Sequence, residues 1–393
     1  MKKESLIKTD RLYLALFKIS YGLFLTYSLL GHISQFATVL KLGTYVGIAL
    51  LIINFLLHPF NYDKKTLYFY ACLMILGVIA LLHSYYSQNY GFIKLLLFSI
   101  AIVNIKFKDL IKFDMYLRGI LILTVVILCK IGIATDVVVL YNGISLRHSM
   151  GFTNPNTLGI ATFILVCDIL YICDMKLNLK SFIAISAITV WLYYMSRSRT
   201  ALLLILFIVV LAFINRLLPK LFSSDVLKMI FYLTPVVLSI ITFIVVKGYI
   251  SGDLWAEKIN ELLSGRVNSI ANFVEELSIT FWGQPIHETL DKTLDNTYAF
   301  VLYDLGICVF ALFMVSYFLI IKRNIKDNTA ICLIAFCFMV YGLSEHLWIN
   351  VDYNIFMLVF VYNVFDVTRM YDLIFNKKEQ NSCLDIKKEA NIF

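Results

Sequence analysis

The chain has 393 residues, of which 60% are hydrophobic and only 15% are charged. This composition lies outside the range of soluble globular domains, so we expect an integral membrane protein. The net charge of +8 comes from 34 lysines and arginines against 26 acidic residues. In a membrane protein the distribution of such charges says more than their sum, and we predict no nucleic-acid partner.

Apolar runs of roughly 15 to 22 residues recur from end to end, which suits helices that cross a hydrocarbon core about 30 Å thick. The first run is long and lacks a small-residue cleavage site, so we interpret it as a retained helix. The sequence thus predicts an all-α, polytopic membrane protein with about 12 transmembrane helices in one domain, 1–376, and a tail, 377–393. The segments run at about 12–30, 44–57, 67–82, 91–103, 115–135, 157–173, 181–195, 200–214, 229–246, 299–321, 330–343 and 354–367.

Charges between these segments predict the topology, because cytoplasmic loops retain lysine and arginine. With the N-terminus inside, every second loop is basic: "HPFNYDKK", "NIKFKDLIKFD", "DMKLNLK", "NRLLPKLF", "KRNIKD" and the tail. The alternate loops "HSYYSQNYG" and "SEHLWINVDY" have neither lysine nor arginine. We therefore predict that both termini are cytoplasmic and that residues 247–298 form one long external loop between the ninth and tenth helices. The eight cysteines fall in apolar runs or the tail, so no disulfide, metal site or cofactor is predicted.

The loop "LRHSMGFTNPNTLGI" departs from this pattern because it places Arg147 on the outer side. Pro155 suits the first turn of a helix, and Asn154 or Asn156 can cap it. Such a helix points free N–H groups outward, which together with Arg147 and His148 forms a candidate anion site. The alternative is an ordinary helix start with an interfacial arginine.

The run "MSRSRTALL" repeats this arrangement at the eighth predicted helix, with Ser198 as a candidate cap. Guanidinium groups suit phosphate because they donate two parallel hydrogen bonds and stay charged. Arg197 and Arg199 are therefore candidate pyrophosphate ligands. Alternatively, both arginines snorkel to lipid phosphates.

The long external loop has the pattern of two amphipathic helices at the membrane surface, with a break at Ser264 and Gly265. Arg266 lies at this break, either as a further anion ligand or as a solvated turn residue. At the end of the loop, Asp295 and Asn296 can cap the tenth helix. Asp295 is also a candidate general base.

The last external loop contains Glu345 and His346, the other acid–base candidates, with Asn350 and Asn354. Charges inside predicted helices are Lys18, Lys94, Lys130, Asp168 and Asp304. Such residues are usually functional or paired inside the bundle. Lys94 and Lys130 lie near helix ends, where lysine can snorkel. No role follows for Lys18 or Asp168.

Taken together, "GFTNPNTLG", "MSRSRTALL", "LSGR" before an amphipathic stretch, "DNTYAFVLYDLGI" and an acidic residue ahead of the last helix occur in a characteristic order. In these runs the chain resembles the Wzy-type polysaccharide polymerases of the O-antigen polymerase and ligase superfamily. The resemblance covers most of the chain from about Arg147 onward.

This resemblance implies a bacterial cytoplasmic membrane protein whose substrate is an undecaprenyl-pyrophosphate-linked oligosaccharide, delivered by a flippase and polymerised with a chain-length regulator. The reaction is a metal-independent glycosyl transfer at the outer face. Family arginines that hold the pyrophosphate map onto Arg199, with Arg197 beside it, and onto Arg266. Asn296 and Tyr298, in the Asn-x-Tyr run, are candidate substrate contacts.

Two alternatives from the same setting stay open. The ligases of the superfamily carry a histidine where this chain has Asp295, which argues against a ligase. A flippase or other transporter would place charged sites near the bilayer midplane, often in two related halves. Here the polar motifs crowd one face. No D-x-D run is present to hold a metal and a nucleotide-sugar, which favours a lipid-linked donor.

Overall fold

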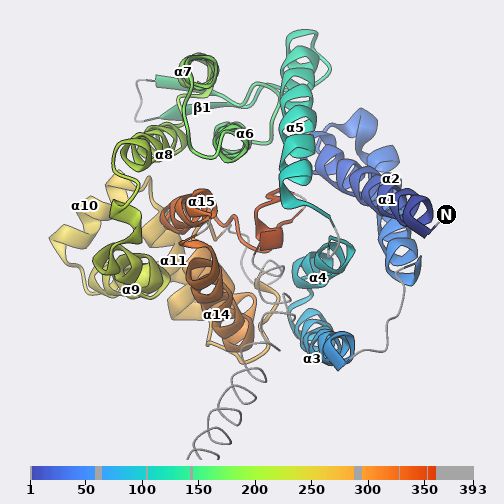
Figure 1. Ribbon diagram of the computed structural model, residues 1–393. Helices are drawn as coiled ribbons and strands as arrows, with labels where there is room; N and C mark the ends of the chain where they lie inside the picture. Colours follow the sequence, from blue (N-terminus) through green and yellow to red (C-terminus); the bar gives the residue numbers. More distant parts are fainter. Residues whose placement is uncertain are drawn as a thin grey trace, which may run out of the picture.

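The computed structural model describes residues 2–57, 64–102, 105–141, 145–286, 294–326, 328–351 and 353–359. Within these residues the chain is almost entirely helical (Figure 1). Seven of the described helices are long and apolar enough to cross a membrane, which makes this a membrane-embedded protein. They are α1 (Lys2–Leu30, apolar from Leu12), α2 (Ser34–Leu57), α6 (Pro155–Ile172), α7 (Leu179–Ser196), α8 (Arg199–Leu217), α9 (Asp225–Ile250) and α14 (Gly306–Asn324).

α3 (Lys64–Ser87) has 24 residues and is apolar after its two lysines. The other predicted segments are shorter, more charged or interrupted, and α4 (Gly91–Ala101) and α15 (Thr329–Tyr341) have only 11 and 13 residues. At about 1.5 Å per residue, α4 and α15 are shorter than a hydrocarbon core of about 30 Å. α5 (Phe107–Lys130) is long but carries charges along its first half. Most of the predicted segment 354–367, and the tail, lie outside the described residues.

The predicted helix 299–321 is wrong as a single element. It divides into α13 (Thr297–Tyr303) and α14, because Gly306 has a φ of +86°, a conformation that breaks a helix. The backbone around Gly283 contacts the backbone around Gly306. A Cβ on either glycine would collide with the backbone of the other segment. The break therefore holds the segment that follows α11 against the bundle.

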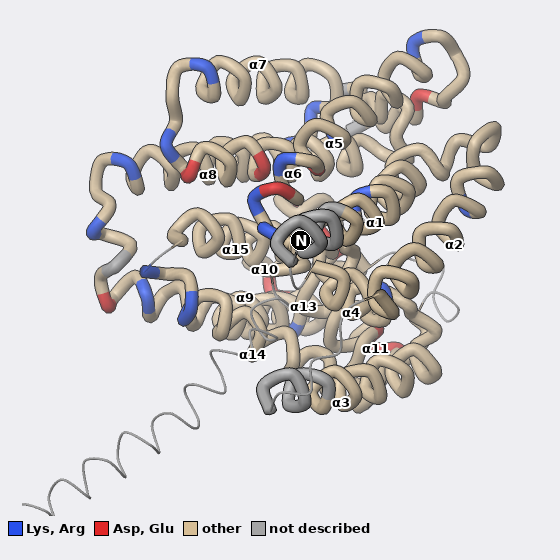
Figure 2. Tube along the Cα trace, turned by 45° about the vertical axis from the view of Figure 1, so that its right-hand side comes forward, with Lys and Arg blue, Asp and Glu red and all other residues tan. Residues whose placement is uncertain are grey.

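Three of the loops that the charge pattern assigns to one side of the membrane lie together at one end of the bundle. Lys108 pairs with Asp174 at 3.1 Å, and Arg216 donates to the carbonyl of Leu177, so the start of α5, the end of α6 and the end of α8 meet at one end. Lysines and arginines gather around the ends of α7, α8, α9 and α14 on this side (Figure 2), and we call it the basic end. Which side of the membrane it faces is a prediction from charge alone.

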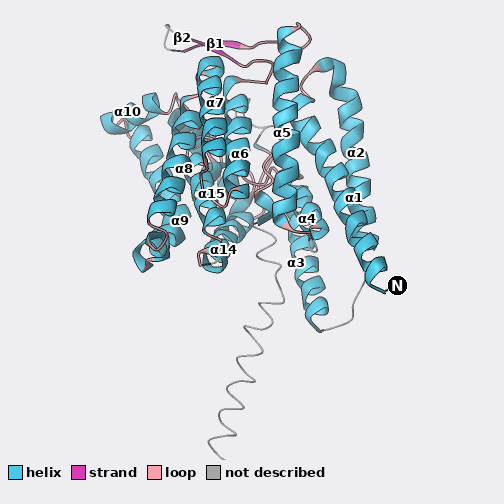
Figure 3. Cartoon of the chain, turned by 45° about the horizontal axis from the view of Figure 1, so that its top comes forward, coloured by secondary structure: helices cyan, strands magenta, loops and turns pink. Residues whose placement is uncertain are grey.

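The opposite end carries a two-stranded antiparallel hairpin, and we call it the hairpin end (Figure 3). β1 (Val138–Tyr141) pairs with β2 (Ser145–His148), with Val139 opposite Arg147. The sequence analysis predicted only a loop here. Strands this short, joined through three residues that the structure does not describe, leave little alternation to detect.

Two short helices cover the same end. α10 (Leu254–Leu262) and α11 (Arg266–Glu276) confirm the amphipathic helices predicted in the external segment. They are separated where Ser264 and Gly265 adopt positive φ angles of 58° and 84°. α11 buries Val267, Ile270 and Phe273 against the bundle, whereas Leu254 and Leu262 of α10 stay exposed. A 3₁₀ turn, Leu221–Ser223, joins α8 to α9 at the basic end.

Candidate functional site

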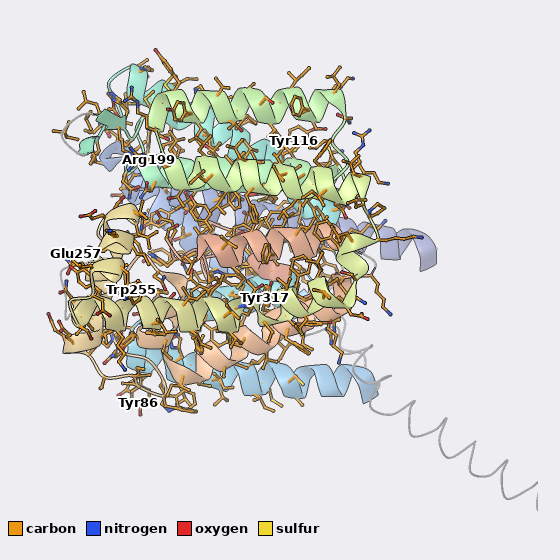
Figure 4. The ribbon with its side chains drawn as sticks, turned by 90° about the vertical axis from the view of Figure 1, so that its left-hand side faces the viewer. Tyr86, Tyr116, Arg199, Trp255, Glu257 and Tyr317 are labelled. Carbon is orange, nitrogen blue, oxygen red and sulfur yellow. The ribbon has the colours of Figure 1, made fainter. Side chains whose placement is uncertain are left out.

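Four of the predicted arginines line one cavity at the hairpin end, with a volume of about 180 Å³. Arg147 comes from β2, Arg197 from the α7–α8 turn, Arg199 from the start of α8 and Arg266 from the start of α11. Figure 4 shows Arg199 at the same end of the bundle as Trp255 and Glu257 of α10. Elements far apart in the sequence thus concentrate guanidinium groups around one space.

β2 directs Arg147 into this cavity. The Arg147 guanidinium donates to Asn156 Oδ1 at 2.8 Å, and its Nε donates to the Ser196 carbonyl at 3.4 Å. Successive side chains of a strand point to opposite faces. The neighbouring His148 therefore turns away from the cavity lining, and its Nδ1 lies 2.6 Å from Asp136 Oδ2.

The start of α6 uses its two asparagines differently. Asn154 caps the helix, since its Oδ1 accepts from the Thr157 N–H at 2.8 Å, and its side chain is exposed outside the cavity lining. Asn156 lies in the lining and holds Arg147. Of the two caps left open by the sequence, Asn154 is the one present.

The α7–α8 turn presents Arg197 and Arg199 to the cavity because of its backbone. Arg197 has a φ of +47°, which ends α7 and reverses the chain. Ser198 occupies the predicted cap position but makes no side-chain cap, so that prediction is wrong. Its hydroxyl is buried against Gly159 of α6, where an added Cβ would come within about 2.5 Å of Ser198 Oγ. This close approach of α6 and α8 sets one wall of the cavity.

Arg266 joins the cavity to the loop after α15. Its guanidinium donates to Glu345 Oε1 at 2.6 Å, and both side chains are largely buried. Arg266 Nε has no hydrogen-bond partner among the described residues. Burial raises the pKa of Glu345 from 4.5 to about 7, against the opposing effect of Arg266; Asp295 raises this pKa and Arg147 lowers it. Glu345 therefore titrates near neutral pH, which suits a general base.

Asp295 lies near this pair, outside the cavity lining. Its Oδ1 is 3.9 Å from His346 Nδ1, and the imidazole stacks on Phe300. Asp295 is partly exposed and is not in the cavity lining. Its effect on the Glu345 pKa is electrostatic, so the two predicted acids lie close to each other and Glu345 is the nearer to the arginines.

Asn296 and Tyr298 hold this loop in place instead of lining the cavity. Asn296 caps α13 through the Ala299 N–H and donates to the Leu343 carbonyl. Thr297 donates its hydroxyl to the Glu345 carbonyl at 2.8 Å. Tyr298 is fully buried, and its hydroxyl donates to the Met339 carbonyl. Asn296 and Tyr298, the two predicted substrate contacts, thus help to hold α13 against α15 and the loop that carries Glu345.

Sequence reasoning missed the neutral lining residues Tyr193, Thr200 and Ser264. Tyr193 lies four residues before Arg197, one helical turn away, which is a spacing that could have indicated it. It also missed the pair Asp114 and Arg118, both fully buried in α5. Their i, i+4 spacing of opposite charges in an apolar helix was the available signal.

The fold and the site define a helical membrane protein with an arginine-rich cavity at one end of its bundle, in which one of the arginines pairs with a buried carboxylate. No family model matches the chain, and neither a curated protein nor a solved structure matches it.

Proposed function

We propose that this protein transfers glycan between lipid-linked oligosaccharides, using a polyprenyl-pyrophosphate donor and thereby polymerising repeat units of a surface polysaccharide. The observation that carries the proposal is the convergence of Arg147, Arg197, Arg199 and Arg266 on one cavity. A pyrophosphate ester offers the two adjacent anionic groups that several guanidinium forks bind best.

These arginines can accelerate the reaction because negative charge develops on the leaving group. The acceptor hydroxyl oxygen forms a new bond to C1 of the donor sugar, while the bond from C1 to the pyrophosphate oxygen breaks. The electron pair of that bond stays on the pyrophosphate. Guanidinium groups stabilise this charge more in the transition state than in the bound substrate, which is the condition for acceleration.

Glu345 is the base we propose for the proton of the acceptor hydroxyl. Its carboxylate pairs with Arg266 in the structure. Arg266 lowers the Glu345 pKa, so a pyrophosphate that draws Arg266 away makes Glu345 more basic. Donor binding would then prepare the base for the acceptor.

The proposed setting is the outer face of a bacterial cytoplasmic membrane, with the hairpin end outside. The support for this is the concentration of lysine and arginine at the basic end. Cysteines introduced at Leu262 and at Lys220, both exposed, test the orientation. An impermeant thiol reagent added to intact cells should label the Leu262→Cys chain above the parent level and should not label Lys220→Cys. The reverse pattern would invert the orientation.

A second candidate is a transporter for the same lipid-linked oligosaccharide. The observation that favours it is the buried charge cluster of Asp114, Arg118 and Asp168, which lies within the bundle instead of at its surface. A ligase of the same superfamily uses the same donor chemistry with a different acceptor.

Reconstitution separates these functions. Purified protein in liposomes with a lipid-linked repeat should give a ladder of longer glycans, which Arg199→Ala should abolish. Arg216→Ala is the matched control, because Arg216 lies at the basic end and contacts a backbone carbonyl. Movement of the substrate across the bilayer without elongation would reject the polymerase and support the transporter. A single transfer to a non-repeat acceptor would support the ligase.

A further inference from the structure

A cluster of charged side chains is sealed inside the bundle, apart from the arginine cavity. Asp114 and Arg118 come from α5, Asp168 from the last turn of α6 and Tyr21 from α1, and all four are fully buried. Buried ionisable groups in a membrane protein are costly unless paired, so their arrangement limits the charge that the cluster can carry.

Asp114 is satisfied as a carboxylate. Arg118 donates to both of its oxygens, from Nε at 2.8 Å and from a terminal nitrogen at 3.0 Å. The Tyr21 hydroxyl donates to Oδ1 at 2.6 Å. A bidentate guanidinium and a phenol therefore stabilise the ionised form of Asp114.

Asp168 has no such support. Its nearest oxygen lies 3.9 Å from Arg118 Nε, beyond hydrogen-bond distance. As a carboxylate, Asp168 finds no hydrogen-bond donor for either oxygen among the described residues. As a carboxylic acid it gains a donor of its own, and it faces the Asp114 carboxylate across the same guanidinium nitrogen, since Arg118 Nε lies 2.8 Å from Asp114 and 3.9 Å from Asp168. Protonation thus supplies the hydrogen bond that the ionised form lacks.

The charge balance leads to the same result. One guanidinium, which stays protonated in proteins, faces two carboxyl groups with no solvent, so a single added proton makes the cluster neutral. The other titratable groups facing it are Tyr21 on α1, Cys167 beside Asp168, and Tyr353, whose ring lies 6.0 Å from the Arg118 guanidinium carbon. Cys337 of α15 faces Cys167. None of these neutral groups supplies a second positive charge.

Lys18, on α1 near Tyr21, is the remaining cation to consider. Its amino group lies 5.4 Å from the centre of the Phe113 ring and pairs with no described carboxylate. It therefore does not neutralise Asp168.

We propose that Asp168 is a proton-binding site in the bundle core. Protonated Asp168 donates a hydrogen bond to the Asp114 carboxylate, and Arg118 is the fixed counter-charge. The site goes beyond the proposed glycan transfer and does not depend on it. It is also linked to the first turn of α6, which carries the cavity residue Asn156. Tyr353, which packs on Arg118, donates its hydroxyl to the Thr157 carbonyl in the first turn of α6 at 2.7 Å. Loss of the proton would place Arg118 between two carboxylates and disturb this contact.

Infrared spectroscopy of the purified full chain tests the proposal directly. At mildly alkaline pH, above the titration of Glu345, the parent protein should retain the C=O stretching band of a protonated carboxylic acid, shifted on transfer to D2O. The band should disappear in Asp168→Asn, whose amide replaces the neutral acid with little change in shape. Glu345→Gln is the matched control and should leave the band intact.

Stability measurements guard against a variant that fails to fold. Asp168→Asn should unfold at the same temperature as the parent or higher at alkaline pH, because it cannot become a buried carboxylate. Absence of the band from the parent, or its persistence in Asp168→Asn, would overturn the proposal. A lower unfolding temperature of the folded Asp168→Asn chain at alkaline pH would overturn it as well, because the amide keeps the shape and the donor of the neutral acid and should cost no stability.

Discussion

Replacement of Glu345 by glutamine should change how the stability of the protein depends on pH. The pKa of Glu345 rises from 4.5 in an exposed chain to about 7 in the folded protein, with burial as the largest cause. The folded state thus binds the Glu345 proton more tightly than the unfolded state. The resulting stability is fully present below about pH 4.5 and is lost as the pH rises through about 7.

The size of the effect follows from the shift. Since one pKa unit corresponds to about 1.4 kcal/mol, the parent protein should lose about 3 kcal/mol between these two pH values through Glu345 alone. Glutamine does not titrate. Relative to the parent, Glu345→Gln should therefore gain stability by this amount as the pH rises over the same interval, and its apparent unfolding temperature should gain several degrees.

Thermal unfolding of both proteins in detergent, followed by tryptophan fluorescence, measures this difference. Titration of other groups cancels when the variant is compared with the parent at each pH. Glu257→Gln, at an exposed position on α10, is the control and should differ from the parent by a constant amount. A flat difference for Glu345→Gln, or a decrease with rising pH, would refute the placement of Glu345 as a buried acid with a raised pKa.

Three further predictions concern the cavity. Arg199→Ala should lower kcat/KM for glycan elongation about 100-fold or more. Arg199→Lys should retain part of the activity, because lysine keeps the positive charge but cannot donate two parallel hydrogen bonds. Equal activity of all three proteins would exclude a pyrophosphate contact. Asn156→Ala removes the 2.8 Å hydrogen bond that orients Arg147 and should lower kcat/KM about tenfold, with kcat lowered as well; an unchanged kcat/KM would contradict this role. Gly159→Val should reduce both expression and activity because its side chain would clash with the α7–α8 turn, while Gly77→Ala, which has open space, should be neutral or slightly stabilising; similar behaviour of the two variants in thermal unfolding would argue against the close contact.

Charge patterns singled out four arginines that the structure brings together. Arg147, Arg197, Arg199 and Arg266 were singled out because they oppose the charge asymmetry of the loops, and they line one cavity. The prediction worked because alternating helices bring every second connection to the same end of a bundle. Asn154 was predicted as a cap for a similar local reason, and local hydrogen bonding depends little on the rest of the fold.

Features that depend on distant contacts were not predictable in this way. The break between α13 and α14 arises where Gly306 meets Gly283, more than twenty residues away, and an apolar run gives no sign of that contact. Tyr298 was interpreted as a substrate contact because of its motif, but its hydroxyl bonds to Met339 of α15. Asp114 was assigned to a basic loop because helix boundaries are uncertain by a few residues, so its pairing with Arg118 went unnoticed.

Glu345 pairs with Arg266 and therefore competes with any anion that binds the arginines of the cavity. An incoming anion has to displace the Glu345 carboxylate from Arg266 before it can bind all four arginines. Inorganic phosphate makes few contacts and gains little from that exchange. A pyrophosphate ester that engages the other three arginines at once can offset the loss. Glu345 would therefore keep the cavity available for extended substrates in the presence of abundant small anions.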